Sequence, residues 1–335
     1  MTAEDTFNER SSAVAGTHGA PSAYRELATR LAREIEGEVL FDAASRGRYS
    51  TDASIYQIEP IGVVVPRRTR DIEAVMGIAG EAGVPVLPRG AGTSQCGQTV
   101  GKALVVDVSK HLNEIVALDV EQSRVRVQPG IVLDRLNARL QARGLFFPVD
   151  VSPANRATIG GMTGNNACGA RSIRYGNMVH NVHAIDALLA DGTRARFAHV
   201  PGNLAGVGDQ AGGARYLDLV QRLRTLAERE AGEIERRIPK LLRRVGGYNI
   251  DSISGAGHNM AHMLVGSEGT LGFFTEIELN LASIPTHRVL GVCHFPSFHD
   301  SMSATPHIVE LDPSAVELVD RTLVALAREI EMVRP

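Results

Sequence analysis

A glycine-rich loop that directly follows a short apolar run constrains this 335-residue chain more than any other feature. The run VPVLP, residues 84–88, has the composition of a buried strand and leads into PRGAGTSQCGQ, residues 88–98. The glycines at 90, 92 and 97 lack the spacing of a Rossmann turn, and no Gly-Lys-Ser/Thr ending follows them. Because residues without a Cβ let the backbone approach an anion, the loop predicts a phosphate site of another kind, with a plain turn as the alternative.

Composition excludes several classes of protein. The net charge is -3 and the chain has no Trp, which disfavours a nucleic-acid surface. No apolar run approaches the roughly 20 residues of a transmembrane helix. The three cysteines, Cys96, Cys168 and Cys293, are widely spaced, which disfavours zinc or iron–sulfur binding and favours a reducing, cytoplasmic setting. The length suits about two domains.

Patterns in the first half of the chain predict a small α/β lobe over about residues 37–145. Residues 1–21 have the composition of a flexible leader, and Pro21-Ser22 begins a helix. Segments 61–66, 69–83 and 84–88 predict a strand, a helix and a strand, and segments 102–109 and 124–130 continue the strand pattern. A helix with Leu133, Leu136 and Leu140 on one face follows.

The second lobe is predicted over residues 146–285. Residues 148–177 are rich in Gly and Asn without periodicity, which is typical of a long binding loop. A hairpin follows, with strands 182–190 and 193–197 around the turn Asp191-Gly192. Leu219, Leu223 and Leu226 mark a helix, and residues 262–285 predict a glycine loop and a closing strand.

A strand–helix–strand–helix pattern begins after Pro285. The strands are predicted at 287–295 and 314–320, and the helices at 297–310 and around Leu323, Leu326 and Ile330. This pattern predicts the start of a third α+β domain, incomplete within residues 286–335.

Two histidine pairs have spacings that metal ligands also use, His180 with His183 and His258 with His262. Neither pair has an acidic or cysteine partner at a matching spacing, so we interpret both as structural or surface residues and predict no metal site.

A second glycine loop, TIGGMTGNNACG at residues 158–169, strengthens the first. Two such loops suit a long ligand, with a phosphate bridge held by one loop and a ring system held by the other. PRGAGTSQCGQ, PVDVSPANRATIGGMTGNNACGARSIRYG, RRVGGYNID and GSEGTLGFFTEIELNL together resemble the FAD-linked oxidases of the vanillyl-alcohol-oxidase (PCMH) type, over about residues 40–330. The resemblance is greatest to the flavin-dependent dehydrogenases of D-lactate, glycolate or D-2-hydroxyglutarate.

The resemblance implies an α+β fold, with a two-lobed PCMH-type FAD-binding domain over 22–285 and the start of a ferredoxin-like cap domain after it. It implies noncovalently bound FAD and oxidation of a 2-hydroxy acid by hydride transfer to flavin N5. It also implies an electron acceptor or a further domain or subunit, which carries iron–sulfur clusters in some large relatives. Cys96 and Cys168 lie in loops where relatives attach flavin covalently, but they match none of those positions, and we interpret them as packing residues.

The resemblance also assigns FAD-binding residues. Around the diphosphate it places Arg89, Gly90, Ala91, Gly92, Thr93, Ser94, Gly97 and Gln98. Along the flavin it places Pro148, Asp150 and Ser152. Around the ring system and the ribityl chain, and at the turn after them, it places Thr158, Gly160, Gly161, Asn166 and Gly169. Near the nucleotide end it places Glu268, Gly269 and Ile277.

On the substrate side, the resemblance implies a cation for the carboxylate, Arg243 or Arg244, with hydrogen bonds from Tyr248 and Asn249. The alternative is that the two arginines cap a helix and stay solvated. Gly246 stands where several relatives have Ser or Thr, so the choice among hydroxy acids stays open.

The His- and Asp/Asn-rich segment that holds a metal and the catalytic base in relatives is not found in this sequence, so we expect the base outside it. SAVELVD resembles the early cap domain, where Glu317 would point towards the site. Two other functions remain open: another enzyme on the same fold, such as a sugar-nucleotide reductase or a carbohydrate oxidase, or a non-catalytic FAD-binding subunit that transfers electrons within a complex.

Overall fold

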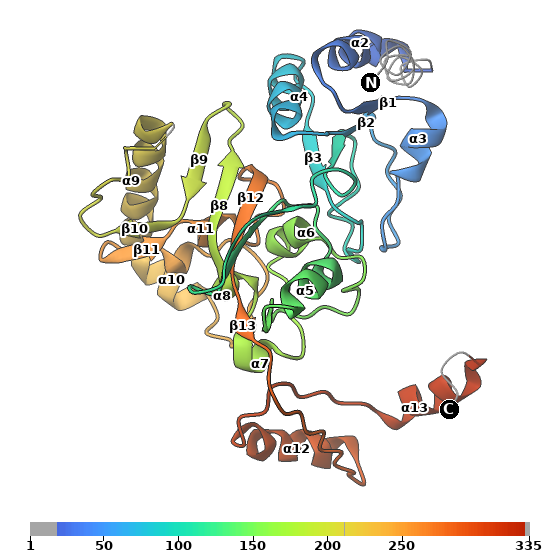
Figure 1. Cartoon of the computed structure of the whole chain (residues 1–335), viewed down its shortest axis with the longest axis vertical. Helices are drawn as coiled ribbons and strands as arrows, with labels where there is room; N and C mark the ends of the chain where they lie inside the picture. The colour runs from blue at the N-terminus through green and yellow to red at the C-terminus, as the bar shows by residue number, and fades with distance from the viewer. Residues whose placement is uncertain (1–18, 211, 332–335) are drawn as a thin grey trace.

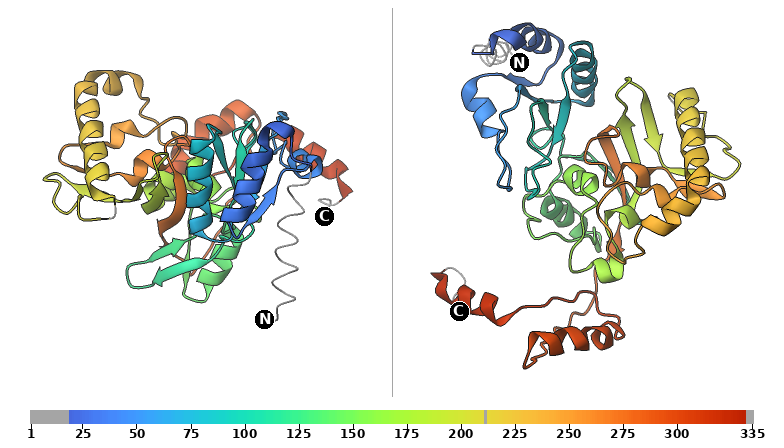
Figure 2. Two further views of the ribbon diagram at one scale, coloured as in Figure 1. Left: turned by 90° about the horizontal axis from the view of Figure 1, so that it is seen from above. Right: turned by 180° about the vertical axis from the view of Figure 1, so that it is seen from behind.

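The computed structural model describes residues 19–210 and 212–331. Two sheets with their helices form the body of the molecule, and residues 286–331 extend away from it (Figures 1 and 2). The predicted leader, residues 1–21, lies almost wholly outside the described residues. Within the described part of the chain, no helix is long and apolar enough to span a membrane.

The first sheet has four strands in the order β1-β2-β4-β3. Strands β2, β4 and β3 are parallel, and β1 is antiparallel to β2. Every residue of β2 and β4 is buried, as expected of central strands covered on both faces. The strands are β1 (Glu38–Leu40), β2 (Gly62–Val65), β3 (Val86–Arg89) and β4 (Leu104–Asp107). The helices of this lobe are η1 (Ser22–Tyr24), α2 (Arg25–Glu34), α3 (Ala43–Arg48) and α4 (Thr69–Glu81).

The second sheet has five antiparallel strands in the order β5-β6-β12-β8-β9. They are β5 (Ile115–Asp119), β6 (Arg124–Val127), β8 (Val182–Leu188), β9 (Arg194–Phe197) and β12 (Phe273–Asn280). Two small ribbons accompany them, β7 (Leu145–Phe146) with β13 (Ala282–Ser283) and β10 (His199–Pro201) with β11 (Gly257–Asn259). The helices are α5 (Leu133–Gln141), α6 (Ile159–Gly164), α7 (Ser172–Tyr175), α8 (Met178–Asn181), α9 (Gly213–Arg229), α10 (Ala231–Arg237) and α11 (Ala261–Leu264), with η2 (Ile250–Ser252).

Most of the elements predicted for the body are present, including the β8–β9 hairpin around Asp191-Gly192. Strands β1 and β5 and helices α3 and α10 were not predicted. The assignment of segments to lobes differs from the prediction. Strands β5 and β6 and helix α5 pack in the second sheet and its apolar core, although the sequence pattern grouped residues up to 145 with the first lobe. A periodic pattern identifies a strand, but it does not say which sheet the strand joins.

Residues 148–177, predicted to be without structure, contain two short helices, α6 and α7. Helix α6 forms despite three glycines among its residues because Ile159 and Met162 are buried and Thr158 caps its first turn. The Thr158 hydroxyl accepts a hydrogen bond from the Gly161 N–H at 3.3 Å. Packing and capping thus outweigh a weak helix propensity.

The prediction for the segment after Pro285 was correct for its helices and wrong for its strands. Helices α12 (Phe298–Val309) and α13 (Arg321–Glu329) form, but the strands predicted at 287–295 and 314–320 do not. A strand needs a neighbour to pair its backbone groups, and none of the described residues pairs with these two segments. Their apolar side chains are accordingly exposed, with Val289 at 97% and Leu290 at 86%.

Candidate functional site

The loop between β3 and β4, residues 90–98, packs directly against the second glycine loop. A Cβ at Gly90 would lie 2.1 Å from Thr158 Oγ1, so the two loops touch at a point where only glycine fits. A Cβ at Gly160 would lie 2.7 Å from the Pro129 side chain, which explains the second Gly in the same way. The structure therefore brings together the two loops that the sequence separates by about 60 residues.

A third loop, residues 266–270, joins them. The Gly266 and Glu268 N–H groups donate to the carbonyl oxygens of Thr163 and Gly164, each at 3.0 Å. Glu268 has a φ of 50° and Gly269 a φ of 80°, so the chain turns sharply against Pro88 of β3.

Gln98 links all three loops through its side chain. Its Nε2 donates to Asn165 Oδ1 at 3.3 Å and to Glu268 Oε1 at 3.0 Å, while its Oε1 accepts a hydrogen bond from the Ser94 hydroxyl. Gln98 was predicted around the diphosphate, and the structure shows it as a bridge between the loops. Asn165 was not among the predicted site residues. Its position next to Asn166 in the second glycine loop was the feature of the sequence that could have indicated it.

The predicted flavin-side segment, Pro148 to Ser152, lies against the end of the second loop. Asp150 Oδ1 accepts a hydrogen bond from the Arg171 N–H at 3.0 Å. A Cβ at Gly169 would lie 2.1 Å from the Asp150 carbonyl oxygen, so this contact also requires glycine. Pro148 is buried and Ser152 is exposed.

Asn166 and Ile277 are occupied by internal contacts. Asn166, at a φ of 49°, accepts a hydrogen bond from the Val179 N–H at 3.0 Å and donates to the Arg244 carbonyl oxygen at 3.3 Å. Ile277 lies fully buried in the middle of β12, opposite Val127 and Ile185. Its side chain faces an apolar core and not a loop.

The four predicted substrate-side residues separate into two pairs. Arg244 donates to Asp251 Oδ1 at 2.6 Å, and the buried Asn249 amide donates to the carbonyl oxygens of His262 and Val265. These two side chains are therefore engaged within the protein.

The other two lie against the glycine loops. The Arg243 guanidinium lies 3.6 Å from Cys168 Sγ in the second loop. The exposed Tyr248 hydroxyl hydrogen-bonds to Thr270 Oγ1 at 2.8 Å in the third loop. Arg243 and Tyr248 thus approach the converging loops from the segment that precedes η2.

One histidine of each pair has an internal hydrogen-bond partner. His180 Nδ1 accepts a hydrogen bond from the Asn177 N–H at 3.0 Å, and His258 Nδ1 lies 2.9 Å from the Ser254 carbonyl oxygen. Burial, with smaller contributions from His180 and His258, lowers the pKa of His262 to about 4. In the part of the chain that the structure describes, no group of three or more His, Cys, Asp or Glu residues could hold a metal ion.

The loops fit the FAD that the resemblance implies. Gly90, Gly160 and Gly169 allow close backbone packing where a Cβ would collide. Among the described residues, six buried side-chain atoms have no hydrogen-bond partner, and one of them, Ser267 Oγ, belongs to the third loop. Buried polar atoms seldom stay unpaired, and a bound ligand or water would supply the partner that the Ser267 hydroxyl lacks.

Comparisons with known proteins show which family the chain resembles. Residues 60–198 match the family model of an FAD binding domain, and residues 284–334 match that of the C-terminal domain of FAD linked oxidases. The D-2-hydroxyglutarate dehydrogenase of Pantoea ananatis is 35% identical over 312 residues, which are 90% of this chain and 30% of the relative. The Escherichia coli dehydrogenase of the same name is 34% identical over 91% of this chain and 31% of its own. Glycolate oxidase subunit GlcD of Bacillus subtilis is 29% identical over 86% and 52%.

The chain thus spans about a third of the dehydrogenases that it matches. Among solved structures, an alkyldihydroxyacetonephosphate synthase superposes with a TM-score of 0.58 at 18% identity, covering 88% of this chain and 47% of that one. This likeness shows the fold. With both family models present in one chain on this fold, the protein belongs to the FAD-linked oxidases with a PCMH-type FAD-binding domain, and its cofactor is FAD.

Proposed function

We propose that this chain forms the FAD-binding part of a 2-hydroxy-acid dehydrogenase and that D-2-hydroxyglutarate represents its substrate class. The observation that carries the proposal is the convergence of three glycine loops, joined by Gln98, in a chain 32–35% identical to four D-2-hydroxyglutarate dehydrogenases. The glycolate oxidase and D-lactate dehydrogenase relatives, at lower identity, support the broader class of 2-hydroxy acids.

In this proposal, the backbone of residues 90–97 holds the diphosphate, with the hydroxyls of Thr93 and Ser94 beside it. The second and third loops hold the rest of the cofactor, which is bound noncovalently. When bound, FAD supplies the hydride acceptor for oxidation of the hydroxy acid.

For the substrate carboxylate we propose Arg243, with Tyr248 as a hydrogen-bond donor. A carboxylate is bound best by a guanidinium whose donors are free to form two parallel hydrogen bonds. Arg244 is already paired with Asp251, whereas Arg243 has the Cys168 sulfur, a weak acceptor, as its neighbour. We therefore assign Arg244 and Asn249 to shaping the segment and Arg243 to the substrate.

The test is a titration of the purified, FAD-loaded protein with D-2-hydroxyglutarate, D-lactate and glycolate under anaerobic conditions. Loss of the flavin band near ~450 nm with one of these acids supports a dehydrogenase and identifies its substrate. Because we expect the catalytic base outside this sequence, an acid can bind without reducing the flavin, and a shift of the flavin band with one acid then also supports a dehydrogenase site. A flavin spectrum that neither bleaches nor shifts with any of them supports the alternative of an electron-transfer subunit. A protein that does not bind FAD contradicts both.

We also propose a reducing, cytoplasmic setting for the protein. Cys96, Cys168 and Cys293 are all unpaired in the structure, which fits such a compartment.

A further inference from the structure

Arg89, at the start of the first glycine loop, points into the protein. The residue is 9% exposed. Its Nη1 donates to the carbonyl oxygens of Tyr49 and Thr99 at 3.2 and 3.0 Å, and its Nη2 donates to that of Thr51 at 2.7 Å. The planar guanidinium thus joins the end of the loop, at Thr99, to the segment that contains Tyr49 and Thr51. A lysine ammonium is a single point of charge and could not reach all three carbonyl oxygens at once.

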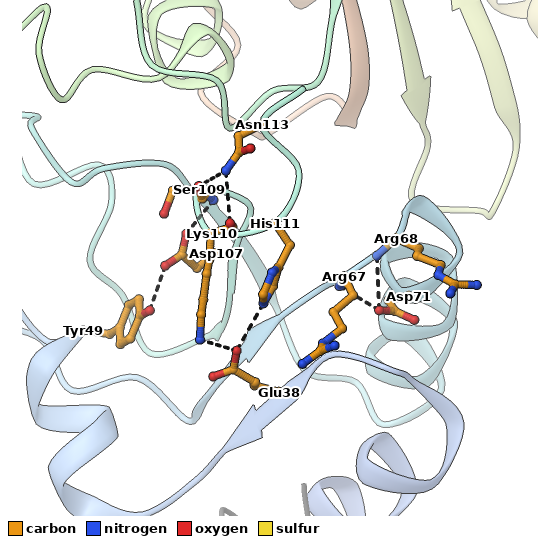
Figure 3. A network of polar contacts seen from close by, with 10 residues as sticks. All are labelled: Glu38, Tyr49, Arg67, Arg68, Asp71, Asp107, Ser109, Lys110, His111 and Asn113. Atoms are coloured by element: carbon orange, nitrogen blue, oxygen red, sulfur yellow. Dashed lines mark hydrogen bonds and ion pairs between the residues drawn. The ribbon is translucent and has the colours of Figure 1, made fainter. Parts of the chain in front are cut away.

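A buried network compensates for the charge of Arg89. Asp107 lies opposite Arg89 in the β3–β4 pairing, and the Tyr49 hydroxyl donates to Asp107 Oδ2 at 2.7 Å, as Figure 3 shows. The Arg89 guanidinium lies over the Tyr49 ring, 5.3 Å from its centre. Burial lowers the pKa of Arg89, and the nearby Asp107 carboxylate opposes that effect.

Residues 49–53, the segment that contains Tyr49 and Thr51, contact the loop at further points. The Ala53 N–H donates to the Gly92 carbonyl oxygen at 3.0 Å, and the Thr99 hydroxyl donates to Asp52 Oδ2 at 2.9 Å. A Cβ at Gly92 would lie 2.6 Å from Arg89 Nη2, so the backbone of the loop packs directly against the guanidinium at this turn. Arg89 therefore supports the loop from its inner side.

We infer that Arg89 is a positioning residue, which fixes the conformation of the diphosphate loop through backbone carbonyls and does not bind phosphate with its charge. The inference rests on the proposed function of this loop. It differs from the assignment by family resemblance, which grouped Arg89 with the residues around the diphosphate. The sequence offered no means of separating the two roles, because a cation beside a phosphate loop suits both.

The experiment compares Arg89→Lys with Arg89→Met and with the control Arg139→Lys, an exposed arginine that pairs with Glu114 on the surface of α5. The dissociation constant for FAD is measured by titrating the apoprotein. We expect both Arg89 variants to bind FAD at least about tenfold more weakly than the wild type, with Lys no better than Met. An Arg89→Lys variant with wild-type affinity would overturn the inference, because the charge alone would then suffice.

A ³¹P spectrum of FAD at saturation gives a local signal that general destabilisation does not produce. We expect the two diphosphate resonances to shift in Arg89→Lys and to stay in place in Arg139→Lys. Unchanged resonances in Arg89→Lys would contradict a role in positioning this loop.

Hydrogen exchange of the apoprotein tests the inference without FAD. Arg89→Lys should speed exchange of the amides at 90–99 while those of β8 stay protected; equal protection of 90–99 in both proteins would overturn it. If Arg89→Lys does not fold, Thr99→Val removes the contact with Asp52 from the same clamp and should show the same local change. Failure of the wild type to bind FAD would instead refute the proposed function. The exchange result would still show whether Arg89 fixes the conformation of residues 90–99.

Discussion

At the scale of single residues, the site depends on positions where a side chain cannot be added. Gly92 has a φ of 66°, and a Cβ on this residue would collide with the Arg89 guanidinium. Gly90 and Gly169 have ordinary backbone angles, but the contacts with Thr158 and Asp150 exclude a Cβ there as well. These glycines are required for two different reasons, backbone conformation and close packing.

Gly92→Ala should therefore weaken FAD binding by about tenfold or more and lower the free energy of unfolding by roughly 1–2 kcal/mol. Gly101→Ala is the matched control, since Gly101 has no positive φ and the nearest atom to an added Cβ is 3.5 Å away. Titration with FAD and thermal unfolding of both variants check the prediction. Equal behaviour of the two variants would show that the turn at Gly92 does not shape the site.

Arg243→Ala should weaken binding of the 2-hydroxy acid by about 10–100-fold, because a charge-assisted bidentate contact is lost. Arg237→Ala is the control, an exposed arginine that pairs with Glu233 on α10. Perturbation of the flavin spectrum by the acid reports its dissociation constant. If Arg244→Ala weakened binding and Arg243→Ala did not, the substrate assignment would pass to Arg244.

At the scale of elements, α6 owes its position to Thr158, which caps the helix and touches the first loop at Gly90. The helix carries Gly160 and Gly161, so it gains little from intrinsic propensity. The capping hydrogen bond and the burial of Ile159 and Met162 hold it in place.

Thr158→Val keeps the shape of the side chain and removes the cap, so we expect a loss of about 1 kcal/mol in the free energy of unfolding. Thr158→Ser keeps the hydroxyl and should lose less. Chemical denaturation of both variants measures the difference. Equal stability of the Val variant and the wild type would mean that the cap contributes nothing to α6.

At the scale of the whole molecule, a two-sheet body contrasts with an extended C-terminal segment (Figure 2). Contacts between residues 286–331 and the body include the exposed ion pair of Arg174 with Asp312, a kind of pair that contributes at most about 1 kcal/mol, and a hydrogen bond from Arg174 Nη1 to the Asp312 carbonyl oxygen. Large apolar side chains of this segment, such as Val289 and Leu290, are exposed, so we expect it to contribute little to the stability of the body.

Hydrogen exchange over the whole protein checks the difference in stability between the two-sheet body and residues 286–331. The amides of 287–295 and 314–320 should exchange within the shortest time sampled, whereas those of β8 and β12 should exchange only by global unfolding. Slow exchange at 287–295 would mean that this segment pairs in solution with a strand.

The stability of the body should also fall in acid. Burial lowers the pKa of His262 from 6.5 to about 4, so the unfolded chain binds its proton more tightly than the folded protein. The contribution of His262 to the free energy of unfolding should therefore decrease by roughly 3 kcal/mol as the pH falls from 6.5 to 4. His262→Gln should flatten this dependence, and His287→Gln, at an exposed site, should not.

The sequence by itself determined many of the local elements of the body and the order of the glycine loops, because turns, caps and apolar periods are set by neighbours along the chain. The β8–β9 hairpin and the strand before Gly90 are examples. It also carried the resemblance that led to FAD.

Only the tertiary structure decided which sheet β5 and β6 join, whether 287–295 finds a partner strand, and where each arginine points. Arg89 turns inward to three carbonyls and Arg244 pairs with Asp251, while Arg243 stays near Cys168. These outcomes depend on groups that are distant in the chain or on backbone atoms that carry no sequence signal, so a local pattern could not predict them.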